Sequence, residues 1–417
     1  MSTNRSFQSM LNEFLANDLL KEELVKTDFL LSQVQKNGNL VDDWKGGNMP
    51  VPFKGAGASS IAFGGLSGSS DVAEDSYVRG SVPYYKELWG TMLFNHKDFM
   101  EHDGKVNEDS FLKILPDAID DFMEYIRGAA SVNMLGGPHF ATLTANGASG
   151  SIVVDHVDRF RIGQKIYLKD GDTAAAAAYV SGIVIDTNTV SIVTARGGVV
   201  AFDASAYTTA QSAKVYHEGA DTAANAFTSL KSSLLSAANG GSSTLYGQTK
   251  TAYPYLQAIN VLGSDITATN ILDKIFDAFT RISTVGKGKP NTVVMSYKHL
   301  GSILKRLEST KGPFNVIPQK EDTSIYGWTE IEILGVRGKL KVVGVQEMDD
   351  DNIMFIDWRA IKFFSNGLFR KRTAPDGKQY FEVRATTGYQ YLLDISLFGE
   401  LVLIRPSYCG ILYSISY

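Results

Sequence analysis

A glycine-rich stretch between residues 46 and 90 constrains the fold of this chain more than any other feature. Nine of its 45 residues are glycine, yet it also carries large apolar side chains such as Phe53, Ile61 and Trp89. Ordering so flexible a segment costs roughly 1 to 2 kcal/mol of backbone entropy per residue, and a loop of this length is uncommon inside a compact domain. We therefore expect a long extended arm whose aromatic and β-branched residues are buried on another copy of the chain.

Length and composition indicate a globular protein of several domains. The 417 residues exceed what one hydrophobic core usually serves, which predicts two or three domains. The net charge of −5 argues against a protein that wraps nucleic acid by neutralising its phosphates. The single cysteine, Cys409, excludes an internal disulfide framework and is expected to be a small buried hydrophobe. No apolar run reaches 18 residues, so we expect a soluble, non-secreted protein.

Two helical patterns flank the glycine-rich stretch. Residues 6–35 place apolar side chains at spacings of three and four, which predicts an amphipathic helix or two short ones. This element either packs on its own domain or docks on a partner. After the stretch, Pro116 is expected to begin the strongest helix of the chain, which ends at Leu135 before Gly136 and Pro138.

Residues 138–217 change to a β-type pattern. Six short runs rich in β-branched and aromatic residues are separated by turn signals such as Asn146-Gly147 and Asp170-Gly171. They predict a small antiparallel barrel or sandwich. A helical pattern resumes at Asp221, so the β-rich piece is expected to be inserted between two helices of a larger domain.

The remainder of the chain alternates helix and strand and then becomes strand-rich. From residue 265 the pattern predicts a helix, a buried strand over 292–296 and a second helix, followed by a loop over 310–330. The acidic turn 349–351 is interpreted as an exposed hairpin tip rather than a cation site. Residues 367–373 and 378–384 are expected to form a hairpin.

The motifs of common enzyme and metal sites are absent. The glycines do not sit between a strand and a helix as a phosphate-binding loop requires, and no histidines are paired at helical spacing. Asp155, His156 and Asp158 are interpreted as solvated turn residues. The sequence therefore predicts no catalytic residue, no metal site and no cofactor. The basic run 370–372 is either a charged strand edge or an intersubunit patch.

The order of these elements resembles the major capsid proteins of tailed double-stranded DNA bacteriophages, which have the Hong-Kong-phage-type or Johnson fold. Two sequence segments carry the likeness. The first, at 291–309, is NTVVMSYKHLGSILKRLES, a strand running into a helix. The second, at 334–364, is LGVRGKLKVVGVQEMDDDNIMFIDWRAIKFF, two strands around an acidic turn. The likeness covers most of the chain, whereas the insert is similar only to the accessory β domains of some members.

The resemblance implies an α+β fold with an inserted small antiparallel β domain. Its parts would be an N-terminal arm at 1–45, an extended loop at 46–95, a peripheral domain with its spine helix at 96–137, the barrel-like insert at 138–217, a peripheral continuation at 218–260, an axial domain at 261–345 and a return to the peripheral domain at 346–417.

The resemblance also implies a function. Such a chain would be a non-enzymatic coat protein that self-assembles, as hexamers and pentamers, into an icosahedral shell in the virion after assembly in the host cytoplasm. Its candidate partners are a scaffolding protein, a portal and a decoration protein; packaged DNA would be contacted weakly and no membrane is involved. The alternatives are an encapsulin-like compartment shell, or an enzyme with the β domain as a lid.

Residues of the extension and of the basic run are the candidates for contact between subunits. They are Phe53, Lys54, Ile61, Phe63, Tyr77, Arg79, Tyr84, Tyr85, Lys86, Trp89, Arg370, Lys371 and Arg372. Some members of the family crosslink their subunits covalently through a lysine–asparagine isopeptide bond. Lys54 lies on the extension, but no motif identifies its partner asparagine or the assisting glutamate, so this chemistry is not predicted.

Overall fold

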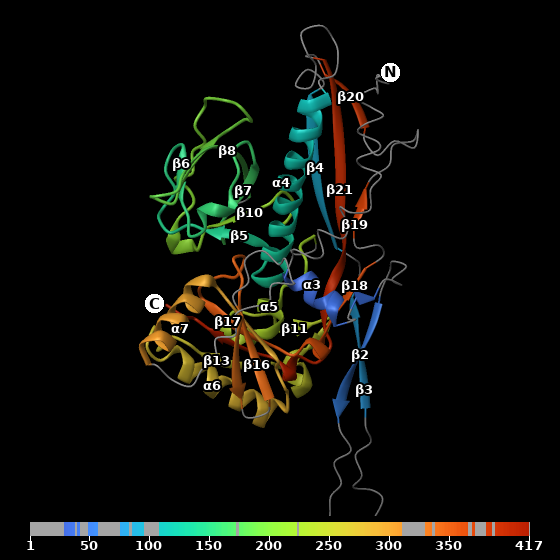
Figure 1. Ribbon diagram of the computed structural model, residues 1–417, viewed down its shortest axis with the longest axis vertical. Helices are drawn as coiled ribbons and strands as arrows, with labels where there is room; N and C mark the ends of the chain where they lie inside the picture. The colour runs from blue at the N-terminus through green and yellow to red at the C-terminus, as the bar shows by residue number, and fades with distance from the viewer. Residues whose placement is uncertain are drawn as a thin grey trace, which may run out of the picture.

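The fold is known from a computed structural model. It describes residues 29–37, 40–41, 49–56, 76–82, 86–95, 108–171, 175–222, 225–310, 330–335, 338–365, 369–371, 381–385 and 388–416. These residues form an α+β protein, as the sequence predicts, built around three six-stranded sheets and one long helix (Figure 1).

A mixed six-stranded sheet forms the centre of the lower body. Its strands, in spatial order, are β13 (Ile259–Leu262), β22 (Gly410–Tyr413), β17 (Asn352–Ile356), β14 (Thr292–Met295), β16 (Gly338–Gly344) and β15 (Glu330–Gly335). Helices α6 (Ile271–Arg281) and α7 (Tyr297–Thr310) cover one face. Because side chains alternate along a strand, Val293 and Met295 pack under these helices, whereas Val294 enters the core on the opposite face.

A second sheet is organised around one 16-residue strand, β21 (Gly388–Leu403). The strands assigned to it are β1 (Leu40–Val41), β18 (Ile361–Phe364), β19 (Phe369–Lys371), β20 (Phe381–Ala385) and β4 (Lys86–Asn95). The helix α4 (Glu108–Leu135) runs along this sheet (Figure 1). Gly90 of β4 permits the close approach, since a Cβ there would lie 2.3 Å from the Ile126 side chain of α4.

The short helices α3 (Phe29–Lys36) and α5 (Leu230–Leu234) complete the core between these two sheets. Leu30 and Leu31 of α3 are buried in the same cluster as Ile119 of α4 and Leu397 of β21. Residues 29–36 therefore pack on their own chain. The single-turn helices are η3 (Val157–Arg159), η4 (Thr209–Gln211), η5 (Ala237–Asn239), η6 (Lys250–Ala252), η7 (Pro254–Leu256), the π-type η8 (Ile282–Gly286), η9 (Trp358–Ala360) and η10 (Pro406–Tyr408).

The six β-type runs of residues 138–217 each form a strand of a small antiparallel barrel. Their spatial order is β5 (His139–Thr142), β10 (Lys214–Tyr216), β7 (Lys165–Lys169), β8 (Ala176–Val184), β9 (Thr189–Val193) and β6 (Ser151–Val153). An antiparallel bridge between Leu143 and Val154 joins the two ends of this order, so the sheet closes on itself. The barrel lies beside α4, which contributes Val132 to its core (Figure 1).

Strands β2 (Met49–Ala56) and β3 (Ser76–Val82) form an antiparallel pair that extends from the lower body, away from α4 (Figure 1). Among the described strands they pair only with each other. Val51, Phe53 and Val82 at the root are buried in a small cluster with Leu256 and Val402. The adjoining two-residue strands β11 (Thr244–Leu245) and β12 (Gln248–Thr249) form a second hairpin.

Several predicted boundaries are wrong. Pro116 lies inside α4, which begins eight residues earlier at Glu108. The helix predicted from Asp221 shrinks to the five residues of α5. The described parts of the hairpin predicted around the turn 375–377 do not pair with each other, because β19 and β20 both pair with β21. Residues 86–95, assigned to the extended loop, instead form β4, whose ten residues all pair with β21.

Candidate functional site

The β2–β3 hairpin is fixed to the body through Tyr246, which lies between β11 and β12. The ring of Phe53 stacks on the Tyr246 ring, with centroids 5.8 Å apart and an interplanar angle of 6°. The backbone N–H of Ser81 on β3 donates to the Tyr246 carbonyl at 2.9 Å. The Tyr246 hydroxyl accepts from the Leu403 N–H at 2.8 Å and donates to the Leu401 carbonyl at 3.3 Å. One side chain thus joins the hairpin to β21.

The predicted intersubunit residues lie in different environments. Phe53 is 2% exposed, so its ring is buried within its own chain. Arg79 on β3 is exposed, and Trp89 on β4 is 49% exposed. Lys86 is half-buried and donates to the Ala226 carbonyl at 2.9 Å. Arg79 and Trp89 are therefore the described candidates with surface available to a neighbouring molecule.

The other candidates are known only by their backbone or not at all. Strands β2, β3 and β19 contain four residues whose side chains lie outside the description, namely Lys54, Tyr77, Arg370 and Lys371. The remaining five lie outside the described residues: Ile61, Phe63, Tyr84, Tyr85 and Arg372.

An exposed stripe runs along β4 on the face turned away from α4. The side chains of Trp89, Thr91 and Leu93, at every second position of the strand, are exposed. Trp89 is 49% exposed and Leu93 is 43% exposed. The Trp89 ring is held edge-on against Phe398 of β21, with centroids 6.0 Å apart. A rigid, exposed aromatic of this kind is typical of a binding surface.

The sequence prediction of an exposed hairpin tip at 349–351 is wrong in two respects: β16 and β17 on either side of the turn each pair with β14, and Asp349 is largely shielded, whereas Asp350 and Asp351 are 43% and 51% exposed. The Asp349 side chain is 18% exposed and accepts from Arg159 Nη1 at 3.3 Å and from Lys231 Nζ at 3.5 Å. Arg159 also donates to the Phe140 carbonyl at 2.8 Å and to the Glu347 carbonyl at 3.1 Å. No local pattern indicates this junction of Asp349, Arg159 and Lys231, because the two cations lie 190 and 118 residues away along the chain.

The charges around this junction set the protonation of its members. Burial alone would raise the pKa of Asp349, but Lys231 and Arg159 outweigh it and hold the pKa below its usual range. Burial, reinforced by Lys214, lowers the pKa of the adjacent His139 to about 4. At neutral pH the Asp349 carboxylate is therefore ionised and the His139 imidazole is neutral.

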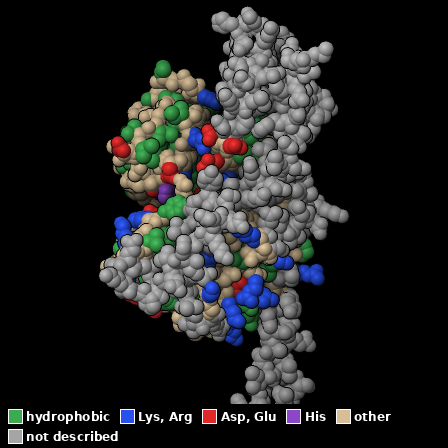
Figure 2. Space-filling model, in the orientation of Figure 1, with side chains coloured by type: hydrophobic (Ala, Val, Ile, Leu, Met, Phe, Trp, Pro, Cys, Tyr) green, Lys and Arg blue, Asp and Glu red, His purple; other side chains and the backbone are tan. Residues whose placement is uncertain are grey.

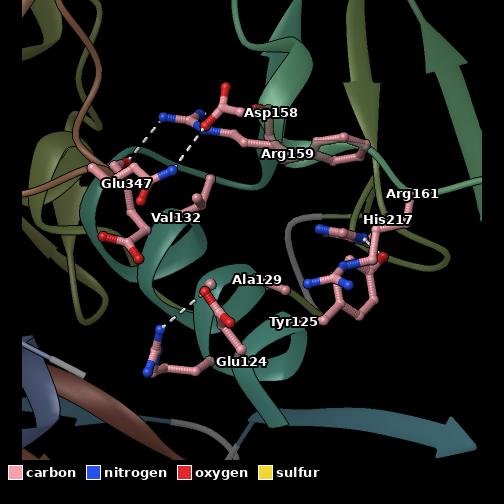
Figure 3. A pocket seen from close by; sticks show the side chains of 13 residues that line it. Glu124, Tyr125, Ala129, Val132, Asp158, Arg159, Arg161, His217 and Glu347 are labelled. Carbon is pink, nitrogen blue, oxygen red and sulfur yellow. Dashed lines mark hydrogen bonds and ion pairs between the residues drawn. The ribbon is translucent and has the colours of Figure 1, made fainter. Parts of the chain in front are cut away.

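A pocket of about 110 Å³ lies between α4 and the barrel, and Figure 3 shows side chains that line it. On one side the Arg161 guanidinium lies 5.4 Å from the centre of the Tyr125 ring, whose hydroxyl is 3.5 Å from His217 Nδ1. On the other side Gln346 Nε2 donates to Asp158 at 3.3 Å. Burial raises the pKa of Tyr125 to about 12 and lowers that of His217 to about 4. Both groups are neutral at pH 7, which suits a packed junction more than proton transfer.

A second buried acid lies where β21 meets the segment that leaves the barrel. Glu400 is 1% exposed, and its Oε1 accepts from the Thr228 N–H at 2.7 Å. Its Oε2 accepts no hydrogen bond from the residues that the structure describes. Burial raises the pKa of Glu400 to about 7, although Lys86 opposes the shift.

The described residues contain no cluster of metal ligands, and the cysteine is buried. Within them, no group of three or more His, Cys, Asp or Glu side chains could hold a metal ion. Cys409 is buried, as predicted, and burial raises the pKa of its thiol to about 12. Among the described helices, none has the length and apolarity needed to cross a bilayer.

Comparison with known proteins gives matches in structure alone. No protein-family model and no curated protein matches the sequence. The chain is similar to the cyanophage A-1(L) capsid protein, with 12% identity, a TM-score of 0.48, and 92% of this chain and 93% of that chain covered. It is also similar to the capsid protein of the native GTA particle (11%, TM-score 0.45, 92% and 91% covered) and to the SrpI encapsulin of Synechococcus elongatus PCC 7942 (6%, TM-score 0.40, 100% and 92% covered).

Proposed function

We propose that this chain is a major capsid protein, a structural subunit that self-assembles into an icosahedral shell around a phage DNA genome. The observation that carries the proposal is the β2–β3 hairpin, which leaves the body from a root fixed by Phe53 and Tyr246. An isolated two-stranded hairpin is marginally stable in water. The glycine-rich residues between its strands, with Ile61 and Phe63, gain stability when a neighbouring copy covers them.

The rigid part of the molecule suits the same role. Helix α4 has 28 residues, which corresponds to about 42 Å, and it lies along the sheet built on β21. A long helix on a long sheet gives a flat, stiff plate, and the central sheet with α6 and α7 forms a second body packed below it. Two such bodies give a subunit several surfaces on which copies can meet, and many modest contacts become strong in a closed lattice.

The proposal extends to partners and location. Copies of the chain would form the hexamers and pentamers of the lattice, and a scaffolding protein, a portal and a decoration protein are its expected partners in the virion and in the host cytoplasm during assembly. The net charge of −5 fits a shell wall that does not hold the genome tightly.

Assembly tests the proposal directly. The chain, expressed alone over a range of concentrations and together with candidate scaffolding proteins, should form closed particles visible by negative-stain electron microscopy. Monomers alone under every condition would contradict it. The nucleic-acid content of purified particles distinguishes a genome container from a compartment that holds protein cargo.

A variant in which a short Asn-Gly turn replaces residues 57–75 tests whether assembly requires this segment. It retains the hairpin root and should stay folded, because Phe53 and Val82 remain packed on the body. It should nevertheless fail to form particles. The matched control is Val285→Ser, which removes an apolar side chain that is 66% exposed on η8 and should leave assembly unchanged.

A further inference from the structure

We propose that a basic patch on the lower body, formed by Lys287, Lys289 and Arg405, contacts the phosphate backbone of duplex DNA. Lys287 and Lys289 flank Gly288 directly after η8, and Arg405 lies directly before η10. All three basic residues are exposed. The inference rests on the proposed capsid function and names the surface through which the shell would touch its genome.

The patch is built from two segments that contain no acidic residue. Neither Asp nor Glu occurs in residues 278–307 or 401–417, although the whole chain has a net charge of −5. Figure 2 shows Lys and Arg side chains gathered on the lower body beside the β2–β3 hairpin, whereas Asp and Glu side chains gather nearer to α4. A local positive potential attracts a polyanion even where the protein as a whole is acidic.

Close backbone packing brings the two segments together at Tyr408. A Cβ on Gly288 would lie 2.4 Å from the Tyr408 carbonyl oxygen, so glycine permits this approach. The Arg405 guanidinium lies 5.4 Å from the centre of the Tyr408 ring, and its Nη1 donates to the Tyr408 hydroxyl at 3.3 Å. Lys287 and Lys289 are each one residue from the glycine, so the three cations belong to one contiguous surface.

The described part of the chain gives these three cations no ion pair. The acid beside η10 is Asp357, whose side chain is 1% exposed and whose N–H lies 3.5 Å from the Cys409 sulfur. Arg359 already occupies this carboxylate, with Nε and Nη2 at 2.9 and 2.6 Å. The positive charge of the patch is therefore available to an anionic partner.

The composition of the patch favours phosphate over another protein. Lysine is depleted at protein–protein interfaces, whereas it is a common contact of phosphate groups, which it binds as a point charge. Two of the three cations are lysines. Residues 286–290 consist of glycine, lysine and proline alone, so this loop presents charge without the aromatic or aliphatic anchor on which protein interfaces depend.

A weak contact in each subunit is sufficient in a shell. Three phosphate contacts give little affinity at physiological salt, but many copies present the same patch to one DNA molecule, so the contacts add up. Such contacts do not depend on base sequence and let DNA slide along the protein. This agrees with a subunit whose overall charge is acidic.

The salt dependence of binding tests the patch. The unassembled full-length chain is titrated into a short, fluorescently labelled duplex DNA of mixed sequence, and the anisotropy is measured over a range of NaCl concentrations. The logarithm of the affinity should fall linearly with the logarithm of the salt concentration. Lys287→Gln together with Lys289→Gln should make this slope shallower by about 2, because each lost phosphate contact removes about 0.9.

Two further double variants serve as matched controls. Lys298→Gln with Lys305→Gln removes the same charge from exposed positions of α7, outside the patch, and should leave the slope unchanged. Lys287→Arg with Lys289→Arg keeps both charges and should also retain the slope. The melting temperature should be the same in all of these variants. A slope that Lys287→Gln with Lys289→Gln leaves unchanged would overturn the assignment.

Competition distinguishes DNA from an acidic protein partner. Poly-glutamate, added at the same concentration of charge, should displace the labelled duplex less well than unlabelled duplex does. Displacement that is equal or better would show that the patch is a site for an acidic polypeptide, and the assignment to DNA would be wrong.

The outcomes separate the two proposals. Particles that form from a chain whose DNA affinity does not depend on Lys287 and Lys289 overturn the patch assignment and leave the capsid function standing. A chain that forms no particles under any condition overturns the capsid function, and the patch is then no genome contact, whatever slope the subunit shows.

Discussion

Asp349 accepts a hydrogen bond from Arg159, with Oδ1 and Nη1 3.3 Å apart. The first residue lies on the turn before β17 and the second on η3 of the barrel, 190 residues earlier in the chain. Lys231 of α5 reaches the other carboxylate oxygen at 3.5 Å. One carboxylate therefore joins the barrel, the central sheet and α5, and it contributes to holding the inserted barrel against the body.

Substitution of this carboxylate should loosen the barrel. Asp349→Asn leaves Arg159, whose side chain is 8% exposed, without its anionic partner, and breaking a buried pair costs about 3 kcal/mol. The free energy of unfolding measured in urea should fall by about that amount. Hydrogen exchange should increase at the contacts between barrel and body more than inside the barrel.

The neighbouring acid provides the control for this prediction. Asp350 is 43% exposed and lies 3.7 Å from Lys298, a pair of the kind that contributes little. Asp350→Asn should therefore change the free energy of unfolding by less than about 1 kcal/mol. Equal losses in the two variants would show that Asp349 does not hold the barrel.

The root of the hairpin depends on one hydroxyl. Tyr246→Phe retains the ring that stacks on Phe53 but removes the group that accepts from the Leu403 N–H and donates to the Leu401 carbonyl. Two hydrogen bonds at a buried site contribute about 2 kcal/mol together. The variant should unfold at a lower temperature in a calorimetric scan and should assemble less well. Tyr255→Phe, on a side chain that is 41% exposed, should have neither effect.

The sequence predicted those elements whose pattern is local. The barrel strands are short β-type runs between turn residues, with clear alternation of apolar and polar side chains in β7, and α6, β14 and α7 follow their apolar spacing closely. The pairing of β19 and β20 could not be predicted in the same way. Both lie against β21, whose 16 residues are long enough to pair with two short strands on one edge. The turn residues between β19 and β20 favour a short hairpin, and no nearby residue indicates that each strand pairs with β21 instead.

The candidate surfaces were predictable only in part. Trp89 was identified as a contact residue because a large aromatic interrupts a glycine-rich stretch, and it is exposed. The sequence does not indicate that Phe53 is buried within its own chain, because its partner, Tyr246, lies almost 200 residues away in the turn between the short strands β11 and β12. Charge alone suggested that the acidic turn is solvated, whereas the position of Arg159 in space decides the environment of Asp349.

Acid should destabilise the protein through His217. Burial lowers its pKa to about 4 from the ordinary 6.5, so the folded protein keeps the imidazole neutral where the unfolded chain binds a proton. This contribution to stability is complete above about pH 6.5 and is lost as the pH falls towards 4. The melting temperature measured between pH 7 and 4.5 should fall less in His217→Phe, whose ring can keep the stacking on Phe140. Tyr125→Phe removes the nearby hydroxyl but not the titrating group, and it should retain the full slope.

The contribution of Glu400 to folding stability should change with pH in the opposite direction to that of His217. Burial raises its pKa to about 7 from 4.5, so between these values the unfolded chain releases a proton that the folded protein keeps. Folding stability from this group is therefore complete below about pH 4.5, falls as the pH rises to 7, and stays reduced above it. Glu400→Gln keeps an acceptor for the Thr228 N–H and removes the cost of burying a charge, so it should stabilise the protein at pH 8 by up to about 3 kcal/mol and have little effect at pH 4.5. Urea unfolding at the two pH values measures the difference. A loss of stability at pH 8 would mean that the ionised carboxylate is paired with Lys86 strongly enough to offset its burial.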